Sequence, residues 1–440
     1  MIKLVVADLW THARVWAGVL LVCIATGGIG AVSVGLIETG NHYGGSIQYD
    51  LAGASTILIL FSTAAALIVL SSATGLAVAL QQWTYAVWQL AGLAPGLVTA
   101  VVLAQLAVTG AVGAVTGWAV VKVFSAPIFG WLWRPLNFAE DISVHLSGTG
   151  LAGIAAAQCL VVLAGGFGGA RRAGRVSPLE ALRTAETAMI PFGWVRGLVL
   201  LVLAGAAAAF SVSLMQAEFE TIAGSALLLI PLFAAVLAAA GTVVFQPVLK
   251  GWTSLVPRRW SASWYLACNS AGYRLGQSTA SITPLMMATA LSGGIFTTAA
   301  TLSSAVGEKR ELSVGVVILM IGGPLLLAGV GAMATVFMSG YAREREFALI
   351  RAAGSTAALV VLAAIWEALI YTVTAAVLGT AAILAGAVVL ALALGLDAPV
   401  LSLASVAVVG GCGFVLLLAA TLVPTFLCVR AEVPSQLAAE

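Results

Sequence analysis

The sequence predicts an all-α integral membrane protein with ten transmembrane helices, arranged as two parallel four-helix repeats plus a two-helix spacer. Of the 440 residues, 61% are hydrophobic and only 8% are charged, whereas about 25% of the residues of a soluble protein are charged. Apolar runs of about 18 or more residues recur along the chain, each long enough to cross a hydrocarbon core of about 30 Å. Similar segments in the two halves of the sequence predict the repeat.

The candidate spans follow one another along the whole chain. The apolar region 356–395 is too long for one span, and Gly379, Gly386 and Gly395 interrupt it. We therefore expect one span there, followed by an apolar segment lying at the outer surface. The ten spans are predicted near 15–37, 51–80, 97–121, 148–170, 193–214, 222–248, 279–302, 314–338, 356–381 and 404–428.

The distribution of Lys and Arg predicts the orientation, because cytoplasmic segments carry an excess of both. With the N-terminus inside, all but four of the 19 Lys and Arg residues fall in cytoplasmic segments, the four being Lys122, Arg134, Lys309 and Arg310. Both termini are then cytoplasmic.

The internal repeat keeps one offset in residue number, 262, over its middle part. Ala86–Gly92 aligns with Ala348–Gly354, and the same offset pairs Gln105 with Glu367 and Gly117 with Gly379. Near the start of each half, Arg14 aligns with Arg274 at an offset of 260. The predicted domains are a first repeat over 1–183, a two-helix spacer over 184–259 and a second repeat over 260–440. Chance similarity between Ala-, Val- and Leu-rich segments is the alternative.

A charged block, Tyr341–Gly354, stands out between two apolar runs. Its helix-forming sequence lacks Pro and internal Gly, and Gly354 is well placed to end a helix. A short amphipathic helix at this place suits docking into a groove of a soluble partner. Anchoring of its Arg residues at lipid headgroups is the alternative. Five charged residues fall within nine positions: Arg343, Glu344, Arg345, Glu346 and Arg351.

These residues resemble the FtsX-like permease domain. The resemblance rests on Arg345–Gly354, on Trp366-Glu-Ala368, on Gly379 and on the segment Arg171–Arg183. The ten-span layout is similar to permeases of the bacitracin-resistance type. The resemblance implies a bacterial plasma-membrane permease that works with a separate cytoplasmic ABC ATPase, expected as a homodimer, which would hold the ATP and Mg. This chain lacks the large extracytoplasmic domain of many members, since its outer loops are too short to fold alone.

The resemblance and the repeat together predict two ATPase-docking connectors. The first is uncharged, so the two connectors are expected to bind by different chemistry, one by packing and the other by ion pairs. The predicted docking residues are Trp83, Tyr85, Trp88, Gln89 and Gly92 in the first connector, and Arg343, Arg345, Glu346, Phe347, Ile350, Arg351 and Gly354 in the second.

No catalytic or metal site is predicted. The phosphate-binding pattern Gly-x-x-x-x-Gly-Lys-Ser/Thr does not occur in the sequence, so we expect no ATPase activity and no cofactor in this chain. His12, His42 and His145 lie in separate loops and are expected to be ordinary surface histidines, and the five cysteines lack metal-ligand spacing. A net charge of +2 does not favour a nucleic-acid partner.

Glu367 is the carboxylate expected deepest in a span, about 16 Å along its helix at about 1.5 Å per residue. A charge there is costly, so it should be paired, protonated or turned toward the bundle. Three roles remain open: a hydrogen bond with Gln105 or a hydroxyl, a place on a substrate or proton path, or a snorkelling side chain. No second Asp or Glu is expected deep in a span, which disfavours proton coupling.

The function predicted is that of a permease subunit of an ATP-driven transporter that exports or extracts an amphiphilic compound, such as a peptide antibiotic or a lipid-like molecule. Its expected partners are the ATPase, membrane lipid and that substrate. An ion-gradient-driven secondary transporter is the first alternative. A membrane scaffold that regulates a partner without transport is the second.

Overall fold

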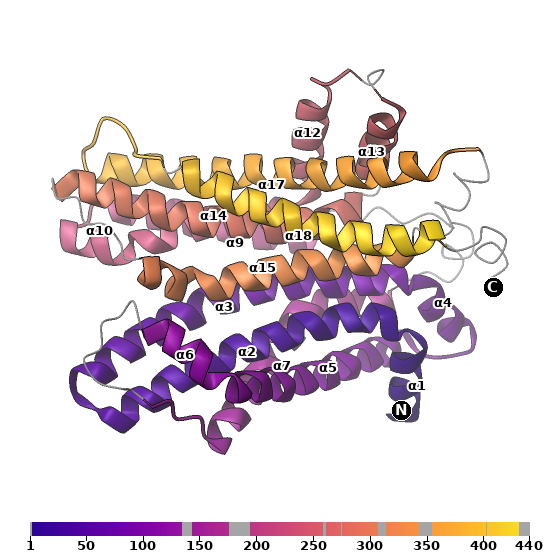
Figure 1. Ribbon diagram of the computed structural model, residues 1–440, viewed down its shortest axis with the longest axis horizontal. Helices are drawn as coiled ribbons and strands as arrows, with labels where there is room; N and C mark the ends of the chain where they lie inside the picture. Colours follow the sequence, from indigo (N-terminus) through magenta and orange to yellow (C-terminus); the bar gives the residue numbers. More distant parts are fainter. Residues whose placement is uncertain are drawn as a thin grey trace. The chain divides into compact units, whose positions relative to one another are not determined.

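A computed structural model describes residues 2–133, 143–175, 194–257, 261–273, 275–306, 314–342, 354–401 and 403–430. Within these residues every regular element is a helix (Figure 1). The all-helical prediction is therefore confirmed for the part of the chain that the structure describes. Residues 343–353, which carry most of the charged block, lie outside it.

Seven helices of the described residues are long and apolar enough to cross a membrane, and they indicate a multi-pass membrane protein. An eighth candidate is the bent pair Ala226–Ala240 and Val243–Thr253. Shorter apolar stretches, Gly322–Met338 and Val406–Ala419, lie within the helices α15 (Val314–Ala342) and α18 (Leu403–Arg430). The seven are Ala13–Tyr43, Ile47–Leu80, Pro95–Val123, Gly148–Gly174, Gly197–Met215, Ser278–Ala305 and Ala357–Ala393.

The chain forms two compact units. Unit 1 comprises Met1–Ala188 and Glu311–Ala334, and unit 2 comprises Met189–Arg310 and Thr335–Glu440. Helix α15 therefore contributes its first part to unit 1 and its last residues to unit 2.

The described residues of unit 1 form a bundle of four long helices and three short ones, to which the first part of α15 is added. The central helix α5 packs against α2 and α7, and α3 packs against both α2 and α7. Helix α1 packs on α5 and α2, and it lies at the same end of the unit as α4 (Figure 1). The bounds are α1 (Ile2–Thr11), α2 (Ala13–Tyr43), α3 (Gly45–Leu80), α4 (Gln82–Leu90), α5 (Pro95–Val123), α6 (Ser125–Trp133) and α7 (Gly148–Gly174).

Glycines allow α2 and α5 to cross in close contact. A Cβ placed on Gly27 would lie 2.6 Å from the carbonyl oxygen of Gly113, and one on Gly117 would lie 2.6 Å from the carbonyl oxygen of Ile24. Helix α7 joins this crossing, because Gln158 Nε2 donates a hydrogen bond of 2.7 Å to the carbonyl oxygen of Cys23. Small residues at such crossings permit extensive van der Waals contact between helices in lipid.

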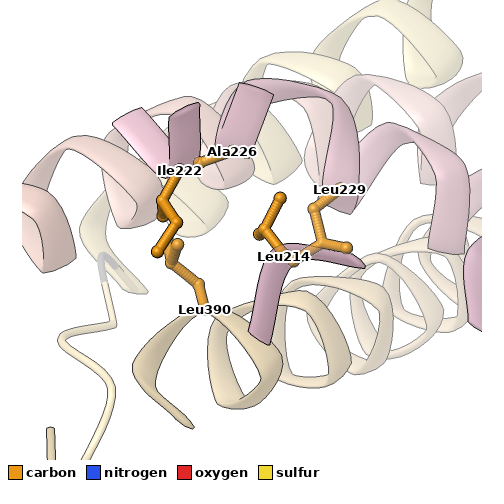
Figure 2. Close-up of a cluster of buried hydrophobic side chains, with 5 residues drawn as sticks. All are labelled: Leu214, Ile222, Ala226, Leu229 and Leu390. Carbon is orange, nitrogen blue, oxygen red and sulfur yellow. The ribbon is translucent and has the colours of Figure 1, made fainter. Parts of the chain in front are cut away.

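Unit 2 is built around the 37-residue helix α17 (Ala357–Ala393). Helices α13 (Ala262–Tyr273), α14 (Leu275–Val306) and α18 pack on it. So do α9 (Trp194–Met215) and α11 (Leu229–Ala240), which also pack on each other. Figure 2 shows a buried apolar cluster joining α9, α10 (Phe219–Ser225), the 3₁₀ turn η2 (Ala226–Leu228), α11 and α17, made of Leu214, Ile222, Ala226, Leu229 and Leu390.

The crossing of α14 and α17 in unit 2 uses positions that the sequence repeat relates to the crossing in unit 1. Gly379 lies against Thr289, whose hydroxyl is 3.5 Å from the carbonyl oxygen of Ala375. The repeat offset pairs these three residues with the glycines at which α2 and α5 cross, Gly117, Gly27 and Gly113 respectively. The two helix pairs therefore meet at corresponding points of their sequences.

One span prediction is wrong, and a second predicted span is bent. Region 356–395 holds one continuous helix, α17, rather than a span followed by a surface segment, because Gly379 and Gly386 pack against neighbouring helices without ending it, and only Gly395, with φ +68°, lies beyond its end. The predicted span 222–248 is broken at Gly241, whose φ is +52°. The following helix α12 (Thr242–Thr253) turns away from the preceding one by 89°.

Replacing Gly113 by Ala is expected to destabilise the bundle. The added methyl group would overlap Cys23 on α2, and overpacking of this kind costs about 1–3 kcal/mol. The control is Gly153→Ala in α7, where a Cβ meets nothing within 4 Å and the higher helix propensity of Ala favours the folded state. Thermal unfolding in detergent measures both. Equal unfolding temperatures for the two variants would contradict the close crossing.

Candidate functional site

The connector between α3 and α5 is the short helix α4, which ends in a turn that requires glycine. Gly92 has φ +96°, in the left-handed region. The backbone N–H of Leu93 donates to the carbonyl of Trp88, and that of Gly92 donates to the carbonyl of Gln89. This pair of bonds is a Schellman motif, and it is followed by Pro95 at the start of α5. The end of α4 and the start of α5 are thereby held in a defined geometry.

Helix α4 has one buried and one exposed face. Tyr85 is fully buried, its ring contacts that of Trp88 edge-on at 5.5 Å, and its hydroxyl donates to Gln81 Oε1 over 2.7 Å. Burial, and after it the negative charge of Asp8, raise the pKa of the Tyr85 phenol, so the hydroxyl keeps its proton. Trp83 and Leu90 are 57% and 58% exposed, and Val87 between them is also exposed.

The predicted residues of the first connector are thus brought together on one helix with different roles. Tyr85 anchors the helix, and Gln89 ties it to the end of α7, since its Nε2 lies 3.3 Å and 3.4 Å from the carbonyl oxygens of Ala173 and Gly174. Trp83 points outward and is available to a partner. Val87 and Leu90, which the sequence did not single out, complete an exposed apolar stripe at i, i+4 and i+7.

The second connector lies mostly outside the described residues. Helix α15 ends at Ala342, and the description resumes at Gly354, whose φ of +93° is close to that of Gly92. A left-handed φ at Gly354 is the conformation that the predicted helix stop requires. The other predicted docking residues, Arg343, Arg345, Glu346, Phe347, Ile350 and Arg351, fall in the undescribed segment.

A buried carboxylate lies at the elbow between α1 and α2. The side chain of Asp8 is 4% exposed, and its Oδ2 accepts a 2.7 Å hydrogen bond from Gln105 Nε2 on α5. Its Oδ1 lies 3.0 Å from His12 Nδ1. The other ring nitrogen of His12 lies 3.4 Å from the hydroxyl of Thr84 on α4. A continuous polar chain therefore joins α5, α1, the elbow and the connector.

The sequence interpretation missed Asp8 and assigned His12 wrongly to the ordinary surface histidines. Both lie on or beside a short helix rather than a long apolar span, so span prediction did not consider them. The signal was their i, i+4 spacing, which places a carboxylate beside an imidazole on one helical face.

Glu367 has a network of its own in unit 2. It is 4% exposed and accepts a hydrogen bond from the hydroxyl of Tyr371, one turn further along α17. The hydroxyl of Ser278 on α14 lies 3.3 Å from the Tyr371 oxygen and donates to the carbonyl oxygen of Ala271 on α13 over 2.8 Å. This network joins α17 to the elbow between α13 and α14. Gln105, one predicted partner of Glu367, is bonded to Asp8 in unit 1.

A third polar cluster lies where the end of α2 meets the start of α7 in unit 1. Glu38 near the end of α2 accepts hydrogen bonds from the backbone N–H and the hydroxyl of Ser147, the N-cap of α7. Beside it the rings of His42 and His145 are in contact, with centroids 3.8 Å apart and planes tilted by 32°. Both histidines are exposed, as surface histidines are, but His42 lies at the end of α2 rather than in a loop, and His145, in the described residues just before α7, lies against it.

Within the described residues no group of three or more His, Cys, Asp or Glu side chains could hold a metal ion. No protein-family model matches this chain, and no curated protein has a significantly similar sequence. Function must therefore be argued from the connectors and the buried polar networks themselves.

If Glu367 serves as a hydrogen-bond acceptor, Glu367→Gln should leave stability within about 1 kcal/mol, because the amide oxygen can still accept from Tyr371. Glu367→Ala should cost about 1–3 kcal/mol by leaving buried hydroxyls without their acceptor. Unfolding temperatures in detergent measure both. A Gln variant as unstable as the Ala variant would show that the negative charge itself is needed.

Proposed function

We propose that the chain is the permease subunit of an ATP-driven ABC transporter that exports or extracts an amphiphilic compound. In this proposal two FtsX-like repeats of four spans flank a two-helix spacer, giving ten spans in all. A separate cytoplasmic ATPase, binding ATP and Mg, would dock on the connectors 81–92 and 341–354. Its closure would move the outer ends of the spans. The setting would be a bacterial plasma membrane, with both chain termini on the cytoplasmic side.

The observation that carries the proposal is the agreement of helix crossings and turns with the sequence repeat. One helix start that is described in both halves agrees as well: α5 begins at Pro95, and the repeat offset carries this position onto the start of α17 at Ala357.

The crossings and turns follow the same offset as this helix start. The offset relates the glycine crossing of α2 and α5 to the crossing of α14 and α17, and the left-handed Gly92 to the left-handed Gly354. One offset for crossings and turns supports two copies of one helical plan, each with a connector at the same place.

A short helix precedes a long one in each half. In unit 1, α1 packs on α2 and α5, and in unit 2, α13 packs on α14 and α17, with the Ser278 hydroxyl on α14 donating to the carbonyl oxygen of Ala271 on α13.

The last helix of each half supports the same plan. In unit 1, Gln158 on α7 bonds to the backbone of Cys23 on α2. In unit 2, Gly413 on α18 lies close to Leu285 on α14, the residue that the repeat aligns with Cys23. The fourth helix of each half thus packs on the first helix at the same position.

The form of α4 supports docking rather than passive anchoring. Its buried Tyr85, its bonds to α7 and its Schellman turn hold it rigidly. A rigid helix that presents Trp83, Val87 and Leu90 can enter a partner's groove with little loss of conformational entropy. The amphiphilic nature of the substrate rests on the resemblance to FtsX-like permeases.

Trp83→Glu is expected to reduce the recovery of an ATPase subunit with the tagged chain by about tenfold or more, as loss of an aromatic anchor does at other interfaces. The control is Tyr49→Glu, which places the same charge on another exposed aromatic residue, near the start of α3. Affinity purification from native membranes with quantitative mass spectrometry measures recovery. Equal recovery with both variants would remove α4 from the docking surface.

Combined charge reversal, Arg345→Glu with Arg351→Glu, is expected to lower ATPase recovery while the unfolding temperature of the chain stays unchanged. The reason is that the second connector is predicted to bind through ion pairs, so this loss should weaken as ionic strength rises. Recovery equal to that of the wild-type chain at low salt would contradict docking through this connector.

A secondary transporter driven by an ion gradient is the second candidate. The observation that favours it is Asp8, which adds a second buried carboxylate to Glu367. Each carboxylate, however, is hydrogen-bonded within its own unit, Asp8 to Gln105 and Glu367 to Tyr371. That arrangement favours structural roles over a shared ion path.

A further inference from the structure

We propose that Asp8 and His12 are positioning residues for the connector α4, so that the α1–α2 elbow and α4 move together. This inference rests on the proposed function only in giving α4 a partner. Its basis is the polar chain that runs from Gln105 through Asp8 and His12 to Thr84.

The carboxylate determines how His12 is held. An ionised Asp8 can only accept, so with Asp8 ionised the 3.0 Å contact requires the proton on His12 Nδ1. The ring is thereby oriented, and Nε2 is presented to Thr84. The Thr84 hydroxyl can donate to a neutral ring or accept from a charged one. The link to α4 therefore persists in both protonation states of the histidine.

The carboxylate in turn is held by α5. Gln105 is fully buried, and its 2.7 Å bond to Asp8 Oδ2 crosses from the centre of the bundle to the short helix α1. Without Asp8 the described polar contact between His12 and the bundle would be lost. A buried charge kept at such a joint is costly unless it is fully bonded, so a role beyond filling space is required to explain it.

In unit 1 and unit 2 the buried carboxylate lies on different members of the short-helix and long-helix pair. The repeat aligns Glu367 with Gln105, and it aligns Ser270 with Asp8. In unit 1 the acid is on the short helix, whereas in unit 2 it is on the long helix α17. Both units keep one buried carboxylate beside the elbow, although its position has been exchanged. We therefore expect that in unit 1 the carboxylate can be transferred from position 8 on α1 to position 105 on α5.

The test is hydrogen–deuterium exchange of the full chain in lipid nanodiscs, read at peptides covering residues 82–93. Asp8→Ala and His12→Ala should each raise exchange there by roughly tenfold, the factor expected for loss of a hydrogen bond to a charged group. Peptides of α5 and α7 should be unchanged. The control His42→Ala removes an imidazole at the opposite end of unit 1 and should leave 82–93 unchanged.

The double variant Asp8→Asn with Gln105→Glu transposes the carboxylate, as unit 2 does, and should restore exchange to within about threefold of wild type. Gln105→Glu alone places two carboxylates together, so exchange at 82–93 should stay raised in that variant. If Asp8 variants fail to fold, Thr84→Val removes the last link alone and should raise exchange only at 82–93. Unchanged exchange in His12→Ala and Thr84→Val, or an equal rise throughout the bundle, would overturn the proposal.

The same variants separate this inference from the proposed function. Raised exchange at 82–93 with unchanged ATPase recovery would leave the positioning role standing and remove the docking role of α4. Unchanged exchange at 82–93, together with loss of ATPase recovery in Trp83→Glu, would remove the positioning role and leave the docking role of α4 standing.

Discussion

The arrangement of unit 1 depends on the close crossing of α2 and α5 at Gly27, Gly113 and Gly117. Lipid is as apolar as the helices, so association must come from van der Waals contact and hydrogen bonds rather than from hydrophobic burial. The glycines bring the two backbones into contact, and Gln158 of α7 bonds to the backbone at the same place. With α5 held there, Gln105 is in position to reach Asp8 on α1. A corresponding crossing at Thr289 and Gly379 organises unit 2.

The buried carboxylates lie close to the places where a short helix meets a long one. Asp8 ties the first elbow to α5, and Glu367 ties the second elbow to α14 through Tyr371 and Ser278. Desolvating a carboxylate costs several kcal/mol unless its oxygens are bonded. Both acids therefore add specificity at places where a short helix meets a long one. In unit 1 the same network reaches α4 through His12, which connects the exposed apolar stripe of that helix to the bundle.

Much of this architecture could be predicted from the sequence, and the failures have physical causes. Gly354 was predicted to end a helix because such a position leaves a local signal, and the repeat aligned it with Gly92 and aligned Gly117 with Gly379. The break at Gly241 and the unbroken α17 were not predicted, since hydropathy reports where apolar residues lie but not whether a helix bends among them. Asp8 was missed because its burial arises only when α1 packs on α5; the local sequence carries the i, i+4 spacing of Asp8 and His12 but not this tertiary contact.

The most direct test of the proposed function is efflux of a fluorescent amphiphilic peptide from proteoliposomes. The chain is reconstituted either alone with an ion gradient, or with its co-purified ATPase and Mg-ATP. ATP-driven transport requires efflux only when the ATPase and Mg-ATP are both present, with no response to the ion gradient. Efflux by the chain alone under an ion gradient would contradict it and would assign the buried carboxylates Asp8 and Glu367 to ion coupling.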